Sequence, residues 1–185
     1  MEKIDSELAA FIATGEKIDQ GSTVWDKMSL EYAYYVSSEP PPLQYVSSVR
    51  AIVFQGDSVM VIHSDRGQYY ILPGGRRENK ESAEETLRRE ILEETGWTLK
   101  GLTILGFMHF HHLGPRPASY PYPYPDFIWL IYTAQVNDYI PESMVYDKYV
   151  QEARFHTLNT LPPLKIEKGE LALLNAAIKL RQDRI

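Results

Sequence analysis

The spacing of apolar and polar positions divides this chain into two parts. Residues 6–36 carry apolar side chains at a helix-like spacing, which predicts amphipathic helix. The apolar positions are Leu8, Phe11, Ile12, Trp25, Met28, Tyr32 and Tyr35. Residues 37–43 include consecutive prolines, and the helix should stop there because the residue before a proline disfavours the helical conformation. We therefore expect a helical extension and a proline-rich linker over residues 1–43.

The second part of the chain has the pattern of strands with one helix between them. Residues 46–54 and 58–63 are rich in β-forming residues, and Gln-Gly-Asp at residues 55–57 predicts a hairpin between them. Further strands are expected at residues 68–72, 99–110, 127–136 and 154–158. Residues 167–184 predict a final amphipathic helix. Its core side carries Leu171, Leu174, Ala177 and Ile178. This order of elements predicts an α/β domain over residues 44–185.

Residues at both ends of the central helix predict where it begins and where it ends. Ser82 and Glu85 have the spacing of a capping box, so the helix should begin next to Ser82. Gly96 is placed to end it in a left-handed conformation. An apolar stripe between these ends consists of Ala83, Leu87 and Ile91. One edge of this helix should therefore pack on a core while the neighbouring acidic edge faces a cleft.

That acidic edge is the strongest chemical signal in the chain. Glu90, Glu93 and Glu94 lie within about one helical turn of each other, where like charges repel unless a cation neutralises them. Oxygen ligands favour Mg²⁺ or Mn²⁺, and the carbonyl of Gly75 is a candidate fourth oxygen. Arg89 is spaced to tether the carboxylates. The alternative is a solvated surface helix with no metal.

The residues around this helix resemble the Nudix box, the signature of the Nudix hydrolase family, over residues 75–97. The positions that the family pattern fixes are held here by Gly75, Glu81, Arg89, Glu90, Ile91, Glu93, Glu94 and Gly96. Trp97 departs from the smaller aliphatic residue of the pattern, at a packing position. Lys80 stands where many relatives have glycine, and we expect Asn79 to take the left-handed turn instead.

This resemblance implies a fold, a reaction and roles for single residues. The fold would be the Nudix α/β/α sandwich with a mixed β-sheet, preceded by the N-terminal helical extension. Glu90, Glu93 and Glu94 would bind Mg²⁺ or Mn²⁺ beside the Gly75 carbonyl, with Glu90 as first choice for an ordering or base role. Arg89 would orient these carboxylates. Glu81 would brace the loop or an outer metal. The reaction would be hydrolysis of a diphosphate linkage in a nucleoside diphosphate derivative.

Two other classes of function remain open. A Nudix-fold module that binds or senses a nucleotide without cleaving it is the main alternative, although such modules usually lack some carboxylates of the box and this chain has them all. A Nudix-fold isomerase of prenyl diphosphates would require a cysteine, and the chain has none.

Candidate substrate contacts flank the box. Arg76 and Arg77 follow the double glycine and are expected either to meet phosphate oxygens or to be solvated. Residues 115–126 form a proline–tyrosine loop, which prolines exclude from a central strand. Its tyrosines, Tyr120, Tyr122 and Tyr124, are expected to stack on a nucleobase or to form a dimer contact.

Two further groups carry weaker signals. His109, His111 and His112 could include a zinc pair, but a cleft lining or a surface loop is the favoured interpretation. Asp147 and Glu152 precede the last strand. Each is interpreted either as an additional metal-binding or base carboxylate or as an ordinary exposed acid.

Composition limits the classes of partner that the protein is expected to bind. The net charge of −6 argues against nucleic-acid polymers and membrane surfaces. The absence of cysteine excludes disulfides, a thiolate nucleophile and cysteine-bound zinc. The N-terminus is too polar for a signal peptide, and no apolar run reaches membrane-spanning length. We expect a cytoplasmic protein that acts on a small-molecule nucleotide, with a homodimer as one option.

Overall fold

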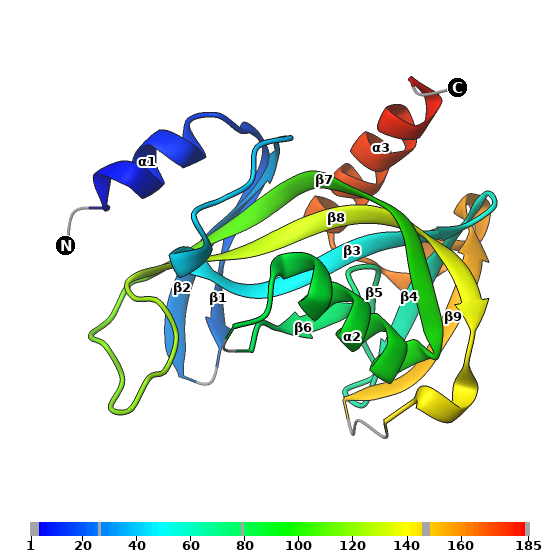
Figure 1. The fold of residues 1–185 in the computed structure, drawn as a ribbon. Coiled ribbons are helices and arrows are strands. Elements are labelled where there is room, and N and C mark those ends of the chain that lie inside the picture. The colour runs from blue at the N-terminus through cyan, green and yellow to red at the C-terminus, as the bar shows by residue number, and fades with distance from the viewer. Residues whose placement is uncertain (1–3, 26, 79, 146–148, 184–185) are drawn as a thin grey trace.

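The computed structural model describes residues 4–25, 27–78, 80–145 and 149–183 (Figure 1). Its strands form a single nine-stranded sheet with the order β1-β2-β7-β8-β3-β4-β5, in which β6 also pairs with β3 and β9 with β4. The strands are β1 (Glu16–Trp25), β2 (Met28–Val36), β3 (Val46–Gln55), β4 (Ser58–Ser64), β5 (Tyr69–Tyr70), β6 (Gly74–Arg76), β7 (Trp97–His112), β8 (Asp126–Tyr139) and β9 (Val150–Thr157). The helices are α1 (Ser6–Ile12), α2 (Ala83–Thr95) and α3 (Lys168–Gln182).

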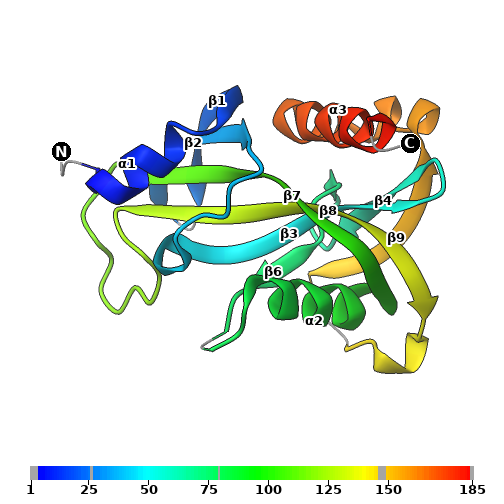
Figure 2. The same cartoon turned by 45° about the horizontal axis from the view of Figure 1, so that its top comes forward.

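Helices cover both faces of this sheet. Helices α2 and α3 lie on opposite sides of it (Figure 2). Leu87 and Ile91 of α2 belong to one buried cluster, together with Leu8 of α1. Leu173 and Leu174 of α3 belong to the other. Strands β3 and β8 run parallel whereas the other neighbours are antiparallel, so the predicted α/β fold with a mixed sheet is confirmed.

The strand predictions after residue 44 are confirmed. The hairpin turns between β3 and β4 at Gly56, whose φ is +57°. Strands β7 and β8 cover the regions predicted for them, and β9 and α3 overlap theirs. Strand β5 is shorter than the stretch predicted for it. No helix in the described part of the chain is long and apolar enough to cross a membrane.

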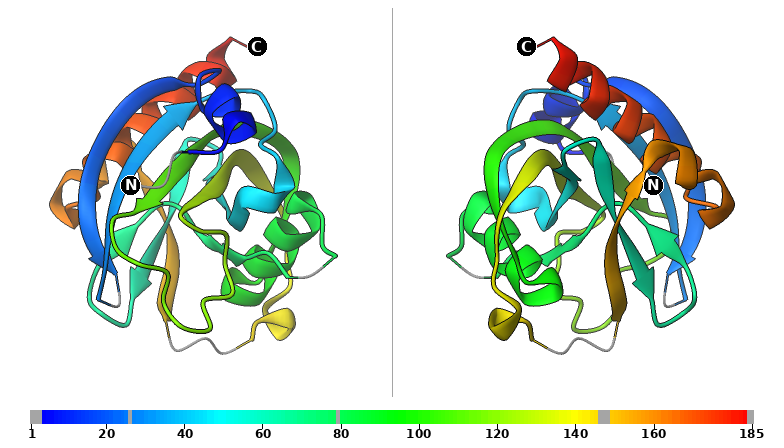
Figure 3. Two further views of the ribbon diagram at one scale, coloured as in Figure 1. Left: turned by 90° about the vertical axis from the view of Figure 1, so that its left-hand side faces the viewer. Right: turned by 90° about the vertical axis from the view of Figure 1, so that its right-hand side faces the viewer.

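The prediction for residues 6–36 is correct only for α1 and wrong for the rest. Strands β1 and β2 form an antiparallel hairpin, and β2 pairs with β7 from Leu30 opposite His112 to Val36 opposite Gly106. The hairpin runs beside α3 (Figure 3). The second half of β2, from Ala33 to Tyr35, is buried on both faces and so lacks the alternation that marks a half-buried strand. The predicted domain boundary between residues 43 and 44 stays a prediction.

Strand β6 places the double glycine beside α2. It pairs with β3, with Gly75 opposite Val49. Gly74 has φ +125°, and a Cβ there would collide with the carbonyl oxygen of Val49. Only glycine therefore allows the chain to pass this close to β3 before it turns into the loop that leads to α2.

Candidate functional site

Helix α2 has the ends that the sequence predicts. Ser82 Oγ accepts the Glu85 N–H at 3.2 Å, and the Glu85 carboxylate accepts the Ser82 N–H at 2.8 Å. Gly96 closes the helix with φ +72°. Leu87 and Ile91 are fully buried, so the apolar edge is anchored and the acidic edge is held beside β6.

Arg89 is the centre of the polar network on that acidic edge. Its guanidinium makes a two-pronged contact with Glu81, with Nε at 2.7 Å and Nη2 at 3.0 Å from the carboxylate oxygens. The remaining nitrogen, Nη1, donates to Glu90 at 2.8 Å and to Glu93 at 3.3 Å. Nη2 also donates to the carbonyl of Arg76 at 3.2 Å. One cation thus fixes the loop glutamate and two helix carboxylates relative to each other.

The pKa values reflect this arrangement. Hydrogen bonds from Arg89 lower the pKa of Glu81 to about 2, and the backbone N–H of Glu78 and the hydroxyl of Thr86 support the same shift. Burial raises the pKa of Glu90 above its usual value, although Arg89 opposes that effect. Glu81 is therefore held as an anion. The charge on Glu90 is only partly compensated, as expected of a carboxylate placed to meet a further cation.

Gly75 and Glu90 are in direct contact. A Cβ at residue 75 would overlap the Glu90 carboxylate, so glycine is what allows this carboxylate to lie against the backbone. The Gly75 carbonyl accepts the Ser48 hydroxyl at 2.7 Å, and a carbonyl oxygen has a second lone pair for another partner. The Glu94 carboxylate accepts the Gly74 N–H at 3.2 Å.

These groups fit a divalent cation by their chemistry. The donors are carboxylates and a carbonyl, the set preferred by Mg²⁺ and Mn²⁺. As they stand, no three His, Asp or Glu side chains of the described residues converge into a complete metal cluster. Glu90 and Glu93 are turned toward Arg89, which is where mutually repelling carboxylates find their nearest positive charge.

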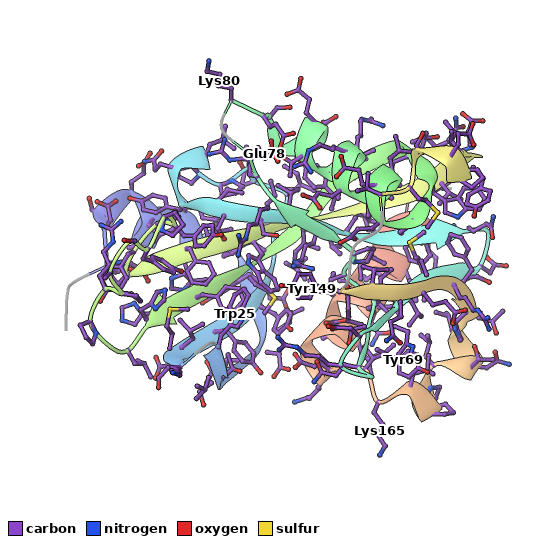
Figure 4. All side chains as sticks on the ribbon, turned by 90° about the horizontal axis from the view of Figure 1, so that it is seen from below. Trp25, Tyr69, Glu78, Lys80, Tyr149 and Lys165 are labelled. Atoms are coloured by element: carbon purple, nitrogen blue, oxygen red, sulfur yellow. The ribbon has the colours of Figure 1, made fainter. Side chains whose placement is uncertain are left out.

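The loop before α2 differs from one expectation. Lys80 itself adopts the left-handed conformation, with φ +77°, and its side chain points outward (Figure 4). Asn79, to which we assigned that conformation, lies outside the described residues. A lysine can replace the family's glycine here because its side chain projects into solvent.

The two arginines after the glycines have different surroundings. Arg76 lies over the ring of Tyr122, with its guanidinium carbon 4.7 Å from the ring centre. Arg77 donates to the carbonyls of Glu81 and Leu43 at 3.2 and 3.3 Å, which braces the loop. Arg76 therefore faces the space beside the box, whereas Arg77 is engaged by backbone.

A cleft of about 280 Å³ adjoins the box at Gly75 and Arg76. Its aromatic lining consists of Trp25, Tyr120, Tyr122, Phe127 and Trp129. Its remaining lining consists of Met28, Ser47, Ser48, Arg50, Gly75 and Arg76. Arg50 stacks on Trp129, with 4.2 Å from its guanidinium carbon to the ring centre. The cleft is therefore aromatic and cationic, and it opens beside the carboxylates of α2.

The proline–tyrosine loop brings two of its three tyrosines to the cleft. Tyr120 and Tyr122 line it, and the Tyr120 hydroxyl lies 3.0 Å from His112 Nε2. Tyr124 is not among the residues that line the cleft in the described chain, and its hydroxyl donates to the Gly114 carbonyl at 2.6 Å. Tyr122 thus stands where a substrate contact requires it, whereas Tyr124 shapes the loop.

The histidines do not form a zinc pair. His109 Nε2 and His111 Nδ1 both lie within hydrogen-bond distance of Asp126 Oδ1, at 2.7 and 2.9 Å. Burial acts to raise the pKa of Asp126, but these two hydrogen bonds outweigh it and lower the pKa. His112 points to the other face of β7, against Phe127 and Tyr120. It therefore contacts two residues of the cleft lining, Tyr120 and Phe127, without belonging to the described lining itself.

Of the two carboxylates near the last strand, the described one, Glu152, stays apart from the network around Arg89. Glu152 is exposed on β9 and pairs with Arg154, which fits an ordinary surface acid. Asp147 lies outside the described residues.

Arg50, Trp129 and Trp25 are site residues that sequence reasoning missed. Arg50 had a usable signal, since it interrupts the apolar strand β3 and an arginine in such a strand needs a partner. Trp129 stands in an apolar strand and resembles a core residue. Trp25 belongs to the region interpreted as helix, so its position at the cleft had no signal.

Comparison with known proteins agrees with the fold. A family model described as NUDIX domain matches residues 44–177, which confirms the family that the box residues indicate. YtkD of Bacillus subtilis (strain 168), provisionally named an 8-oxo-dGTP diphosphatase, is 47% identical over 53 residues, which are 29% of this chain and 32% of that protein. The match thus spans about a third of this curated relative.

Two solved structures carry the same fold. A point mutant of the Bacillus subtilis pyrophosphohydrolase BsRppH superposes with a TM-score of 0.59 at 19% identity, over 90% of this chain and 98% of that one. A NUDIX hydrolase from Nitrosomonas europaea gives a TM-score of 0.55 at 19% identity, over 72% of this chain and 89% of that one. At such identities the likeness concerns the fold.

Proposed function

Because this chain belongs to the Nudix hydrolase family, we propose that it is a metal-dependent hydrolase of a diphosphate linkage in a nucleoside diphosphate derivative. The observation that carries the proposal is the contact of Glu90 with Gly75. A carboxylate with a raised pKa lies against a glycine whose replacement by a larger residue would push the carboxylate away, beside Glu93 and Glu94 on the same helix. A solvated surface helix would have no reason to keep this contact.

The metal-binding residues in this proposal are Glu90, Glu93, Glu94 and the carbonyl of Gly75. Bound Mg²⁺ or Mn²⁺ supplies neutralisation of phosphate charge and a lower pKa for water. Arg89 and Glu81 act as positioning residues, because their two-pronged ion pair ties the loop to the acidic edge. This pair sets the distance between the carboxylates and the cleft.

The reaction is a displacement at phosphorus. A water oxygen attacks a phosphorus atom of the diphosphate, the bridging P–O bond breaks, and the leaving phosphate keeps the electron pair. We assign the departing proton of the water to a carboxylate of this acidic edge, with Glu90 as first choice because it lies against Gly75, which lines the cleft.

The four candidate substrate-binding residues have different roles in this proposal. Arg76 and Tyr122 lie at the cleft and suit a phosphate oxygen and a nucleobase. Arg77 and Tyr124 act on the substrate indirectly, because each holds the loop that carries its neighbour. The name of the relative YtkD makes 8-oxo-dGTP one substrate to test. A cytoplasmic location and a homodimer contact stay predictions.

The test is a panel of nucleotide substrates assayed with and without Mg²⁺. The panel should contain 8-oxo-dGTP, the common nucleoside triphosphates, ADP-ribose and a nucleotide sugar. We expect chelator-sensitive release of phosphate or nucleotide from at least one of them. Replacing Glu93 or Glu94 by Gln should lower kcat/KM roughly a hundredfold or more, as loss of a charge-stabilising group does.

The matched control is Glu84→Gln on the same helix. The Glu84 side chain is 57% exposed and pairs only loosely with Arg88, at 3.9 Å, so its loss should leave turnover unchanged. Turnover that survives chelation would overturn the proposed chemistry. Nucleotide binding without turnover of any substrate would favour the silent binding module instead.

A further inference from the structure

Trp25 occupies an unusual position at the end of strand β1. Its side chain is 43% exposed, at the tip of the hairpin rather than in either core cluster (Figure 4). Its ring meets Trp129 edge to face, with 5.7 Å between ring centres and an angle of 87°. Both rings line the cleft beside the box. A large exposed indole that borders a cleft is a common sign of a binding surface.

The rest of the cleft indicates the chemistry of its ligand. Arg50 stacks on Trp129, and Arg76 lies over Tyr122 on another part of the wall. Arg50 Nε is buried without a hydrogen-bond partner among the described residues. The described lining carries no carboxylate. Cations between aromatic rings suit an anion that also has a flat aromatic part.

The cleft also has the right position for a nucleotide. Gly75 belongs both to its lining and to the contact with Glu90. A base held among the rings would therefore have its phosphates directed toward the acidic edge of α2. The volume of about 280 Å³ lies close to the lower end of the range for small-molecule sites, which suits part of a nucleotide rather than a large ligand.

We propose that Trp25 and Trp129 form a base-stacking wall and that the N-terminal hairpin is thereby part of the substrate site. This inference rests on the proposed function and extends it, because Trp25 lies outside the region that matches the family model, residues 44–177. Trp25 is then a base-binding residue supplied by a segment that the family signature does not include.

The same lining sets the selectivity among bases. Stacking accepts any base because every base has an aromatic face. Strong discrimination requires buried groups that hydrogen-bond the edge of the base. The hydrogen-bonding side chains of the described lining include Arg50, Arg76, Ser47, Ser48, Tyr120 and Tyr122, so discrimination between adenine and guanine has to come from such groups.

The experiment measures binding without metal, so that it is independent of hydrolysis. ADP, GDP and the base-free ribose 5-phosphate are titrated by calorimetry in the presence of chelator. Trp25→Ala should weaken ADP and GDP binding by roughly tenfold or more and leave ribose 5-phosphate unchanged. Trp25→Phe keeps an aromatic face and should restore most of the affinity. Val24→Ala is the matched control, since Val24 is 69% exposed and does not line the cleft.

The outcomes separate this inference from the proposed function. A purely structural Trp25 would lower the melting temperature on replacement by Ala while the Kd of ADP stays at the wild-type value, and this would overturn the stacking wall. An equal loss for ADP and ribose 5-phosphate would overturn it as well. A base-dependent effect of Trp25 in a protein that hydrolyses no substrate would support the wall and reject only the proposed chemistry.

Discussion

The box segment (residues 74–96) and the cleft beside it are built in different ways. In the box segment, Arg89 reaches Glu81, Glu90 and Glu93 within a single loop and helix. The cleft instead collects side chains from β1, β2, β3, β6, β8 and the proline–tyrosine loop. The first arrangement is local and the second depends on the whole sheet. In the proposed function, the residues for chemistry therefore lie in a short segment, whereas the residues for substrate choice are distributed over the fold.

The sharpest test of the local region is Gly75→Ala. A Cβ at this position overlaps the Glu90 carboxylate, so the carboxylate must move away from the backbone. We expect kcat/KM to fall about a hundredfold, as misplacement of a reacting group does, with the fold intact by circular dichroism. Gly114→Ala is the control, because a Cβ there meets nothing within 4 Å. Equal activity of the two variants would break the link between Gly75 and the site.

Tyr122→Ala tests the distributed region. The ring lines the cleft and lies under Arg76, so its loss should raise KM about tenfold and change kcat little. Tyr124→Phe removes only the hydroxyl that donates to Gly114 and keeps the ring. It should raise KM less than Tyr122→Ala does, because Tyr124 acts on the substrate only through the loop. A lower kcat with an unchanged KM for Tyr122→Ala would place this tyrosine in the chemistry rather than in substrate choice.

The same contrast explains what the sequence could and could not predict. The capping box, the stripe of Leu87 and Ile91 and the left-handed Gly96 depend on neighbours within a few turns, and all are present as predicted. The prediction of helix for the hairpin of β1 and β2 is wrong because β2 pairs with β7, which lies far along the chain. Its tyrosines are buried on both faces, with Tyr34 2% and Tyr35 7% exposed, which removes the alternation of a strand.

The cleft could be predicted only in part for the same reason. The sequence indicates Arg76 and Tyr122 because one follows the double glycine and the other lies in an unusual loop. Trp25 on β1 and Trp129 on β8 come into contact only in the assembled sheet, where β2 and β7 lie between these two strands in the strand order. Spacing along the chain carries no information about such a contact, since no local period relates the two residues.

Glu170 should make the stability of the protein depend on pH. This buried carboxylate on α3 accepts the N–H of Ile71, just before the box, at 2.7 Å. Burial raises its pKa from 4.5 to about 7. The folded state thus prefers the protonated acid, and the stability from this preference is full below pH 4.5 and lost as the pH rises through 7.

The variant Glu170→Gln cannot titrate and keeps an oxygen that can accept the Ile71 N–H. Its free energy of unfolding should exceed that of the wild type by on the order of 1–3 kcal/mol at pH 8, with the difference shrinking at pH 5. Urea unfolding at both pH values measures this. A difference that does not depend on pH would show that Glu170 has no raised pKa.

The smallest expected effect is that of Ser82→Ala, which removes the local N-cap of α2. The Ser82 hydroxyl accepts the Glu85 N–H at 3.2 Å, and without it this N–H loses its partner in the cap. The protein should lose roughly 1 kcal/mol of stability, measured by thermal or urea unfolding without metal. Ser82→Thr keeps the hydroxyl and should be close to the wild type. Because the acidic edge is anchored by Leu87 and Ile91 further along the helix, turnover at saturating metal should be nearly unchanged. An unchanged melting temperature for the alanine variant would mean that contacts across the sheet, rather than the local cap, hold the start of α2.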